Sequence, residues 1–248
     1  MLDAYVSGEV INRSVLSSTV ITMKRIGIIG GTSPESTLYY YRKYIEISRE
    51  RFGPYSFPEL VVYSMNFQEF RENPEGWKGR KQMLINAAKP LERAGAEVIG
   101  ISANTPHLVF PDVQKAVGAR MISIIDAVAR EAEKKGLRRL LLLGTKTTTT
   151  MRFYRDVLEG RGFEVVVPSD GEVDEIDRII FEELMFENLE SKPWLLDLID
   201  RYSRGESIEA VILGCTELPL AVKAGDVDVD VLDTAEIHMR ALIEAATE

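Results

Sequence analysis

The sequence predicts an α/β protein of two similar domains, each with a short parallel sheet flanked by helices, related by a pseudo-twofold axis with the site between them. Three observations predict this class. Short apolar runs alternate with longer segments of helical period. The runs are mostly unbroken, as in strands whose two faces are both covered by helices. Similar polar motifs also follow four of these runs at closely matching intervals.

We expect four strands in a first domain, residues 24–126, and four in a second, residues 127–234. In chain order these strands are Arg25 to Gly30, Leu60 to Met65, Glu97 to Ser102, Met121 to Ile124, Arg139 to Leu143, Glu164 to Val167, Ala210 to Leu213 and Val229 to Leu232. The segments between them repeat apolar residues at three and four positions, which predicts helical, right-handed crossovers. We expect the C-terminal helix, residues 235–248, to pack back on the first domain.

Residues 1–22 precede the first predicted strand and carry no secretory pattern of a basic stretch followed by an apolar one. Met23 stands directly before that strand. We therefore interpret residues 1–22 as an extension upstream of a natural start at Met23, with a genuine N-terminal arm as the open alternative.

The composition excludes several classes of protein. The 248 residues are 45% hydrophobic and 28% charged, which suits a folded chain, and the formal net charge of −9 would repel nucleic acid. No apolar run is long enough for a membrane span. One cysteine and two histidines allow neither an internal disulfide nor an ordinary zinc site. We expect a cytoplasmic protein with no structural metal and no nucleic-acid or membrane partner.

The polar motifs that follow the strands occupy equivalent places in the two predicted domains. Gly31-Thr32 and Ala103-Asn104-Thr105 follow the first and third strands of one domain, and Gly144-Thr145 and Cys215-Thr216 hold the same places in the other. The two intervals differ by a single residue. Since ligands of parallel sheets bind beyond the carboxyl ends of the strands, two facing half-sites predict one site between the domains.

Cys215 is the first candidate for chemistry. It lies between Gly214 and the polar pair Thr216-Glu217, after a predicted buried strand and at an expected helix start. The partial positive charge of a helix N-terminus should lower the thiol pKa and favour a base or a nucleophile. The alternative is a cysteine that only fills space in the core.

The other strand-end residues are candidate ligands for a carboxylate. Thr32 precedes a predicted helix start, with Ser33 as N-cap and Pro34 in the first position, whose backbone N–H groups suit an anion. Asn104 and Thr105 offer an amide and a hydroxyl to a carboxylate or ammonium group. For each of these the open alternative is an ordinary helix cap.

A hydroxyl-rich loop beginning at Thr145 holds the equivalent place in the second domain. It is interpreted as a second carboxylate cradle, with a local turn as the alternative. We interpret His107 as a satisfied helix residue and make no functional claim for His238.

Taken together, five segments resemble, in the same order, the motifs of the aspartate/glutamate racemase family. They are GIIGGTSPESTLYYY, SMNFQEF, GAEVIGISANTPH, LLLGTKTTTTMRFYRDVL and VILGCTELPL. The likeness covers nearly everything from Met23 onward. Glu217 after the Cys-Thr pair resembles the aspartate racemase and broad-specificity amino-acid racemase branch.

The resemblance implies an isomerase without pyridoxal phosphate or another cofactor, commonly a homodimer, acting on an acidic amino acid or dicarboxylate between its domains. One cysteine from each domain would exchange a proton with one face of the substrate Cα. Hydrogen bonds to the α-carboxylate would stabilise the carbanion. Carried over by position, the substrate-binding residues are Thr32, Ser33, Gln68, Asn104, Thr105, Thr145, Thr216 and Glu217.

The chain departs from the family pattern at Ala103, where relatives have Cys or, in some broad-specificity members, Thr. A methyl group transfers no proton. Four explanations stay open: an engineered replacement, Ser102 or a bound water as the second proton carrier, a reaction that needs one thiol, or lost catalysis. Single-cysteine decarboxylases of the arylmalonate type exemplify the third, and a non-catalytic carboxylate-binding protein the fourth. The segment Pro168 to Glu172 also lacks the lysine that aspartate racemases often carry there.

Overall fold

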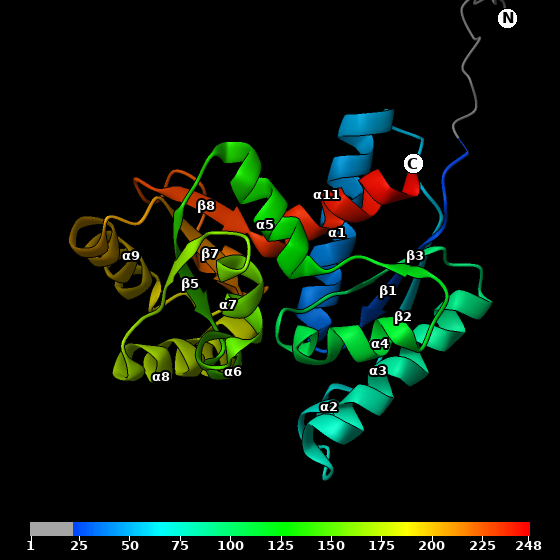
Figure 1. The fold of residues 1–248 in the computed structure, drawn as a ribbon, viewed down its shortest axis with the longest axis horizontal. Helices are drawn as coiled ribbons and strands as arrows, with labels where there is room; N and C mark the ends of the chain where they lie inside the picture. The colour runs from blue at the N-terminus through cyan, green and yellow to red at the C-terminus, as the bar shows by residue number, and fades with distance from the viewer. Residues whose placement is uncertain (1–21) are drawn as a thin grey trace, which may run out of the picture.

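The computed structural model describes residues 22–248 and confirms the predicted fold class (Figure 1). The expected N-terminal extension lies, apart from Thr22, outside the described residues. Two four-stranded sheets follow one another along the chain, and every strand pair in both is parallel. The strand orders, β2-β1-β3-β4 and β6-β5-β7-β8, are equivalent.

The first half of the chain builds one sheet. Its strands are β1 (Ile26–Gly30), β2 (Leu60–Ser64), β3 (Val98–Ile101) and β4 (Arg120–Met121). Its helices are α1 (Pro34–Phe52), α2 (Phe67–Arg71), α3 (Gly76–Arg93), the 3₁₀ turn η1 (Thr105–Val109), α4 (Phe110–Lys115) and α5 (Ile124–Lys135). Within the described chain no helix is long and apolar enough to cross a bilayer.

The second half builds the other sheet. Its strands are β5 (Arg139–Gly144), β6 (Glu164–Val166), β7 (Ala210–Gly214) and β8 (Asp230–Asp233). Its helical elements are α6 (Lys146–Thr150), α7 (Arg152–Glu159), α8 (Asp170–Arg178), the π-helical turn η2 (Ile179–Glu183), the 3₁₀ turn η3 (Leu184–Phe186), α9 (Lys192–Glu206), α10 (Leu218–Ala221) and α11 (Thr234–Ala246).

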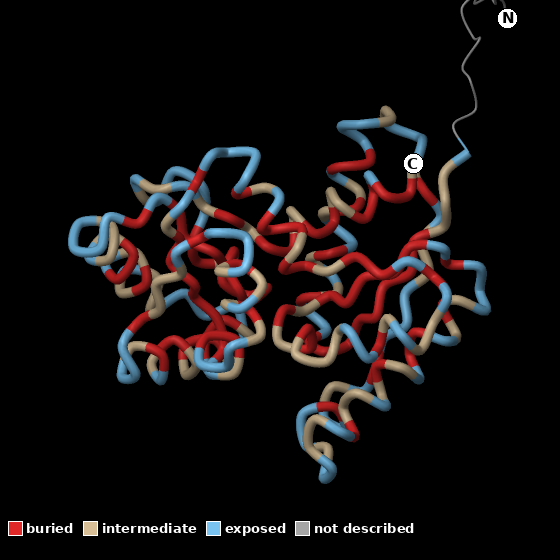
Figure 2. Tube along the Cα trace, in the orientation of Figure 1, coloured by how far each residue is buried: buried red, intermediate tan, exposed pale blue. Residues whose placement is uncertain are grey.

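Both faces of each sheet are covered, which explains the unbroken apolar runs. Leu140 and Leu142 of β5 pack in one cluster with α5 and α7, whereas Leu141 and Leu143 pack in another with α8 and α9. In the first sheet, α1 and α11 cover one face and α3 covers the other. Figure 2 shows the central strands buried in both halves.

The two halves exchange their last helices. α5 follows the first sheet in sequence but packs on the second sheet, where Ile124, Val128 and Ala132 join the core of β5 and β7. α11 follows the second sheet but packs on the first, where Met239 and Leu242 join the core of β1 and β3. The two helices meet in the middle of the molecule (Figure 1). The boundary expected between residues 126 and 127 therefore falls inside α5.

One local prediction needs correction. The strand expected at Met121 to Ile124 ends at Met121, because Ser123 accepts a hydrogen bond from the Asp126 N–H and caps α5, which begins at Ile124. In α1, Tyr40 and Tyr44 are buried, whereas Tyr41 between them is exposed.

Candidate active site

The carboxyl ends of the two central strands in each sheet border one cavity of about 390 Å³, lined by both halves of the chain. Its volume lies within the range of small-molecule sites. The predicted site residues that line it are Thr32, Ser33, Ala103, Asn104, Thr105, Thr145, Cys215, Thr216 and Glu217. The expected convergence of the four strand-end loops is thus present in the structure.

Gln68 is the one predicted ligand that does not line this cavity. It lies on α2, where Phe67, Phe70 and Arg71 face the cavity at helical spacing, so position 68 falls on another side of the helix. The Gln68 side chain is exposed and donates a hydrogen bond to Glu72 at 3.2 Å.

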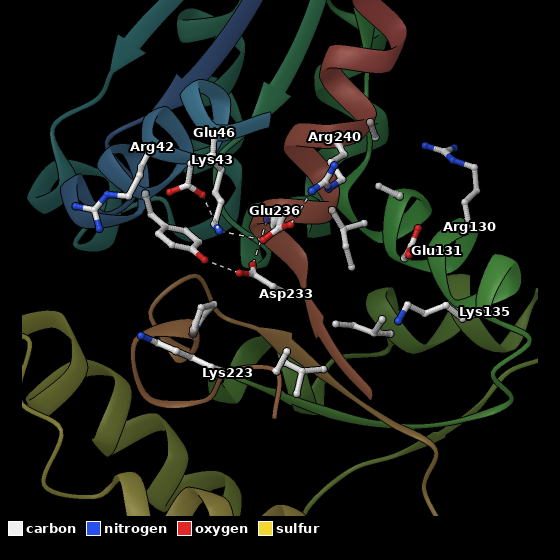
Figure 3. A pocket seen from close by; sticks show the side chains of 18 of the residues that line it. Arg42, Lys43, Glu46, Arg130, Glu131, Lys135, Lys223, Asp233, Glu236 and Arg240 are labelled. Atoms are coloured by element: carbon white, nitrogen blue, oxygen red, sulfur yellow. Dashed lines mark hydrogen bonds and ion pairs between the residues drawn. The ribbon is translucent and has the colours of Figure 1, made fainter. Parts of the chain in front are cut away.

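A larger cavity of about 1010 Å³ lies among α1, α5, α11 and the loop after α10 (Figure 3). Several polar groups on one side of it pair with one another. Tyr39 donates a hydrogen bond to Asp233 at 2.5 Å, and Glu236 accepts from Lys43 at 3.0 Å and from Arg240 at 3.2 Å. None of the predicted site residues lines this cavity, so the smaller one is the candidate active site.

Cys215 follows β7 directly and is buried with its thiol against a carboxylate. Its Sγ donates a hydrogen bond to Glu217 Oε2 at 2.9 Å, and Thr216 Oγ1 donates to the same oxygen at 3.1 Å. Burial raises the thiol pKa well above its ordinary value, and the negative charge and hydrogen bond of Glu217 raise it further.

The expectation that a helix N-terminus lowers the pKa of Cys215 is therefore wrong, because the pKa is raised. The helix that follows, α10, has only four residues, and its dipole is correspondingly weak. The backbone N–H groups of Thr216 and Glu217 do lower the pKa, but burial outweighs them.

Ala103 lies at the equivalent strand end of the first half, and its backbone is held by a histidine. His107 Nε2 accepts a hydrogen bond from the Ile124 N–H at 3.0 Å, so Nδ1 carries the proton and donates to the Ala103 carbonyl at 2.9 Å. Burial lowers the pKa of His107 to about 4, which keeps the ring neutral. Ser102 is fully buried and donates to the Ile29 carbonyl at 3.2 Å, so its hydroxyl does not reach the cavity.

Asn104 connects the two halves beneath the cavity. Its Nδ2 donates to Thr234 Oγ1 at 2.9 Å, and its Oδ1 accepts from the Tyr154 hydroxyl at 3.3 Å. Thr234 donates onward to the Leu213 carbonyl at the end of β7. The amide keeps one N–H that these bonds do not use.

Three threonine hydroxyls join the halves on another side. Thr105 Oγ1 lies 3.0 Å from Thr145 Oγ1 and 2.8 Å from Thr148 Oγ1, and the last two are 3.2 Å apart. Thr145 also caps α6. The hydroxyls of this loop are therefore engaged with one another across the two halves, and the predicted carboxylate cradle stays a prediction.

Thr32 differs from these threonines because its hydroxyl has no partner. Its Oγ1 is buried without a hydrogen bond to any described residue. The Thr32 side chain is 9% exposed and lines the cavity. Gly31, with φ of 78°, makes the preceding turn, where a Cβ would lie 2.2 Å from the Met65 carbonyl oxygen. Ser33 caps α1 with Pro34 in its first turn, as predicted. A buried hydroxyl without a partner is costly unless a ligand supplies one.

Sequence reasoning missed one side of the cavity, which is apolar. Phe67, Phe70 and Trp77 come from the first half, and Ile180, Phe181 and Met185 come from the second. We call these six residues the apolar wall. Its only sequence signal was the i, i+3 spacing of Phe67 and Phe70. Within residues 22–248, no group of three or more His, Cys, Asp or Glu residues is placed to hold a metal ion.

The twin sheets, with one cavity between their strand ends and a single buried thiol in it, define a class of two-domain α/β proteins with a small-molecule site between the domains. The family model for Asp/Glu/hydantoin racemases matches residues 29–242, and the chain belongs to this family.

Relatives support the assignment. The broad specificity amino-acid racemase RacX of Bacillus subtilis (strain 168) is 28% identical over 144 residues, which are 57% of this chain and 63% of RacX. The chain thus aligns with less than two thirds of that relative. A crystal structure of an aspartate racemase homologue from Pyrococcus horikoshii OT3 is 67% identical, with a TM-score of 0.85, and covers 91% of this chain and 100% of its own.

The aspartate racemase of Picrophilus torridus shares the fold at 24% identity and a TM-score of 0.69, over 90% of this chain and 94% of its own. The predicted family is confirmed. RacX and the Picrophilus torridus protein are named as racemases, which are isomerases.

Proposed function

We propose that the chain is a cofactor-independent amino-acid racemase homologue that transfers a proton at the substrate Cα through Cys215. One observation carries this proposal: the only cysteine lies at a strand end in the cavity between the halves, hydrogen bonded to Glu217. Family membership supports the same reaction class.

The polar end of the cavity suits the carboxylate of an amino acid. Thr32 offers a hydroxyl without a partner, and Asn104 offers an unused N–H. Hydrogen bonds from these groups to the α-carboxylate would stabilise the negative charge that develops when Cα loses its proton.

Cys215 must become a thiolate to act as the base. Glu217 Oε2 already accepts the thiol hydrogen bond and is placed to take that proton. The positive ammonium group of a bound amino acid would also lower the thiol pKa. The Cα–H bond then breaks, an S–H bond forms, and the electron pair stays on the substrate as an enediolate until the proton returns.

Ala103 limits the outcome. The equivalent strand end of the first half has no group that transfers a proton, and Ser102 donates to a backbone carbonyl. We therefore expect Cys215 to exchange the Cα proton from one face with retention, faster than the configuration inverts.

The test is incubation with each enantiomer of a panel of amino acids in D₂O. Loss of the Cα–H signal is followed by NMR, and inversion by optical rotation. Exchange that exceeds inversion supports the proposal. Absence of exchange with every amino acid, or exchange that persists in Cys215→Ser, would contradict it.

The apolar wall favours a second candidate, a single-cysteine decarboxylase. A departing carboxylate is destabilised in apolar surroundings, so a 2-substituted malonate would lose CO₂ there. The C–C bond breaks, the resulting enediolate takes a proton from Cys215 at Cα, and water reprotonates the thiolate. Release of CO₂ from phenylmalonate without Cα exchange in amino acids would select this reaction. Binding without either reaction would select a carboxylate-binding protein.

Pairing of two copies of this chain in the cytoplasm belongs to the same proposal. α1 exposes Leu38 and Tyr41, and the edge strand β2 exposes Val62 and Tyr63. Burial of such apolar side chains in a dimer would be favourable. Sedimentation of the chain and of Tyr41→Glu measures the pairing, and a monomer at all concentrations would contradict it.

A further inference from the structure

The apolar wall gives the cavity a chemical asymmetry. Hydroxyls, an amide and the thiol lie at the strand ends, whereas the six wall residues come from the helices beyond them. The wall residues belong to α2 and α3 in the first half and to η2 and η3 in the second. In Figure 1, α2 and α8, the helix that η2 continues, lie in the lower part of the picture, one in each half. A ligand held by its carboxylate at the strand ends would place its remaining group toward this wall.

The apolar wall is incompletely buried by the rest of the chain. Phe70 and Ile180 are 7% and 1% exposed, but Phe67, Trp77 and Phe181 are only half-buried. Removing such apolar surface from water is favourable in proportion to the area covered. A large apolar group on the ligand would cover this apolar surface, whereas a methyl group would leave most of it exposed to water.

Two of the cations that border the wall are engaged by other groups of the chain. Arg80 donates Nε to the Phe70 carbonyl at 3.0 Å and Nη2 to the Arg71 carbonyl at 2.6 Å, with its guanidinium 5.1 Å from the Trp77 ring centre. Lys146 pairs with Asp174 at 2.5 Å.

Arg71 is exposed, and its guanidinium lies 4.9 Å from the ring centre of Phe181, where it braces the ring by a cation–π contact. Acidic groups also line the cavity. Glu217 accepts from the thiol, and Asp177 accepts the Lys146 N–H at 2.6 Å. Their carboxylates would repel a second negative group on the ligand.

We propose that the apolar wall receives the substrate side chain, so that the site takes amino acids with large uncharged side chains, such as phenylalanine, leucine and methionine, in preference to aspartate and glutamate. This specificity rests on the Cα proton transfer proposed for Cys215. The polar end then holds what all amino acids share, and the wall selects among them.

The first test measures Cα–H exchange in D₂O for phenylalanine, leucine, alanine, aspartate and glutamate with the full chain. We expect phenylalanine and leucine to exceed aspartate and glutamate by at least about tenfold in kcat/KM, the scale of pocket discrimination by apolar contacts. Faster exchange of the two acidic amino acids than of phenylalanine and leucine would overturn the proposal. If Arg71→Ala then abolished that faster exchange, the Arg71 guanidinium would be the group that selects acidic side chains.

The second test separates the wall from neighbouring surface. Phe181→Ala should raise KM for phenylalanine by about tenfold and leave KM for alanine unchanged, since alanine does not reach the wall. Phe186→Ala is the matched control, because Phe186 lies on the same segment, is 74% exposed and does not line the cavity. Equal effects of the two variants, or an equal effect on alanine, would contradict a side-chain site.

The third test is independent of turnover. Calorimetric titration of Cys215→Ser with the same five amino acids reports affinity alone. Tighter binding of phenylalanine and leucine than of aspartate supports the wall even if no exchange is found, in which case only the proton-transfer role fails. Tighter binding of the acidic amino acids, or no binding of any of the five, would overturn the proposal.

Discussion

The two halves of the molecule use the same scaffold to present different chemical groups. Each has four parallel strands in the same order, and in each the third strand along the chain ends in a short polar motif at the shared cavity. At that place the second half carries Cys215, hydrogen bonded to Glu217, and the first half carries Ala103. The sheet therefore fixes where a side chain acts, and the identity of that side chain decides which chemistry is available.

The surroundings of the two positions differ as well. The carbonyl of Ala103 accepts a hydrogen bond from the neutral imidazole of His107. The ring centres of His107 and His238 lie 6.0 Å apart. The second half has no histidine beside its sheet, and at the end of β7 the Leu213 carbonyl instead accepts a hydrogen bond from Thr234 Oγ1 at 2.8 Å. These differences can be tested one at a time.

Removal of the thiol should have the largest effect. We expect Cys215→Ala to lower the rate of Cα–H exchange by about 10³-fold, within the range that general acid–base groups contribute. NMR in D₂O measures the rate. The free energy of unfolding should change little, because the thiol is replaced by a smaller apolar group at the edge of the core.

The control for that loss is Cys215→Ser, which replaces the thiol with a hydroxyl of similar size whose pKa is far higher than that of a thiol. It should be nearly as slow as Cys215→Ala. If either variant exchanges at the rate of the unmodified chain, Cys215 is not the acid/base and the contrast between the halves has no chemical meaning.

Making the halves alike should have the next largest effect. Ala103→Cys places a second thiol at the strand end of the first half, with room in the cavity that Ala103 lines. We expect the ratio of inversion to exchange to rise by about 10²-fold, since a proton then reaches the second face of Cα. Optical rotation and NMR measure the two rates on one sample. Ala103→Ser, with a hydroxyl instead, should give a much smaller gain, and an unchanged ratio in both would place the limit elsewhere.

Acid should weaken the first half selectively. Burial lowers the pKa of His107 to about 4 and that of His238 to about 3, from an ordinary 6.5. Since the unfolded state then binds more protons, the stability that these neutral rings confer is complete above about pH 6.5 and is lost as the pH falls toward 4. Each ring contributes a slope of up to about 1.4 kcal/mol per pH unit.

Denaturant unfolding between about pH 7 and pH 5 measures that slope, and hydrogen exchange locates it. Protection should fall first in β1 and β3, because His107 bonds to the Ala103 carbonyl just after β3 and His238 lies against Gly100 within it. A free energy of unfolding that stays constant over this interval, or an earlier loss in β5 and β7, would contradict the assignment.

The fold was predictable because its signals are local. Unbroken apolar runs such as Leu140 to Leu143 mark strands covered on both faces, and all eight predicted strands are present. The packing of α11 on the first sheet was expected, but the packing of α5 on the second sheet was not. The sequence shows that a helix is amphipathic but not which sheet it covers. The neighbouring residues Tyr40 and Tyr41 show the same limit, since one is buried and the other exposed although the two side chains are identical.

The site was predictable where topology decides and not where side-chain direction decides. Strand ends brought Thr32, Ala103 and Cys215 to one cavity. Gln68 was placed by resemblance alone, and a helical rotation turns it outward. The pKa of Cys215 depends on burial and on the rotamer of Glu217, neither of which sequence spacing reports.

The smallest expected effect separates two threonines that the sequence treats alike. The hydroxyl of Thr32 is buried without a partner, whereas that of Thr145 is bonded to Thr105 and Thr148. Thr32→Val should therefore stabilise the ligand-free chain by about 1 kcal/mol, because it removes an unsatisfied polar group. It should also weaken amino-acid binding severalfold, because it removes a donor to the carboxylate.

Thr145→Val is the matched variant in the second half. It should destabilise the ligand-free chain by about 1 to 2 kcal/mol, because it leaves the hydroxyls of its two partners with fewer bonds. Thermal unfolding of both variants, with and without amino acid, gives the comparison. Changes in unfolding free energy of opposite sign in the absence of ligand would mean that the Thr32 hydroxyl is available to substrate, whereas the Thr145 hydroxyl joins the two halves. Changes of equal sign would contradict that distinction.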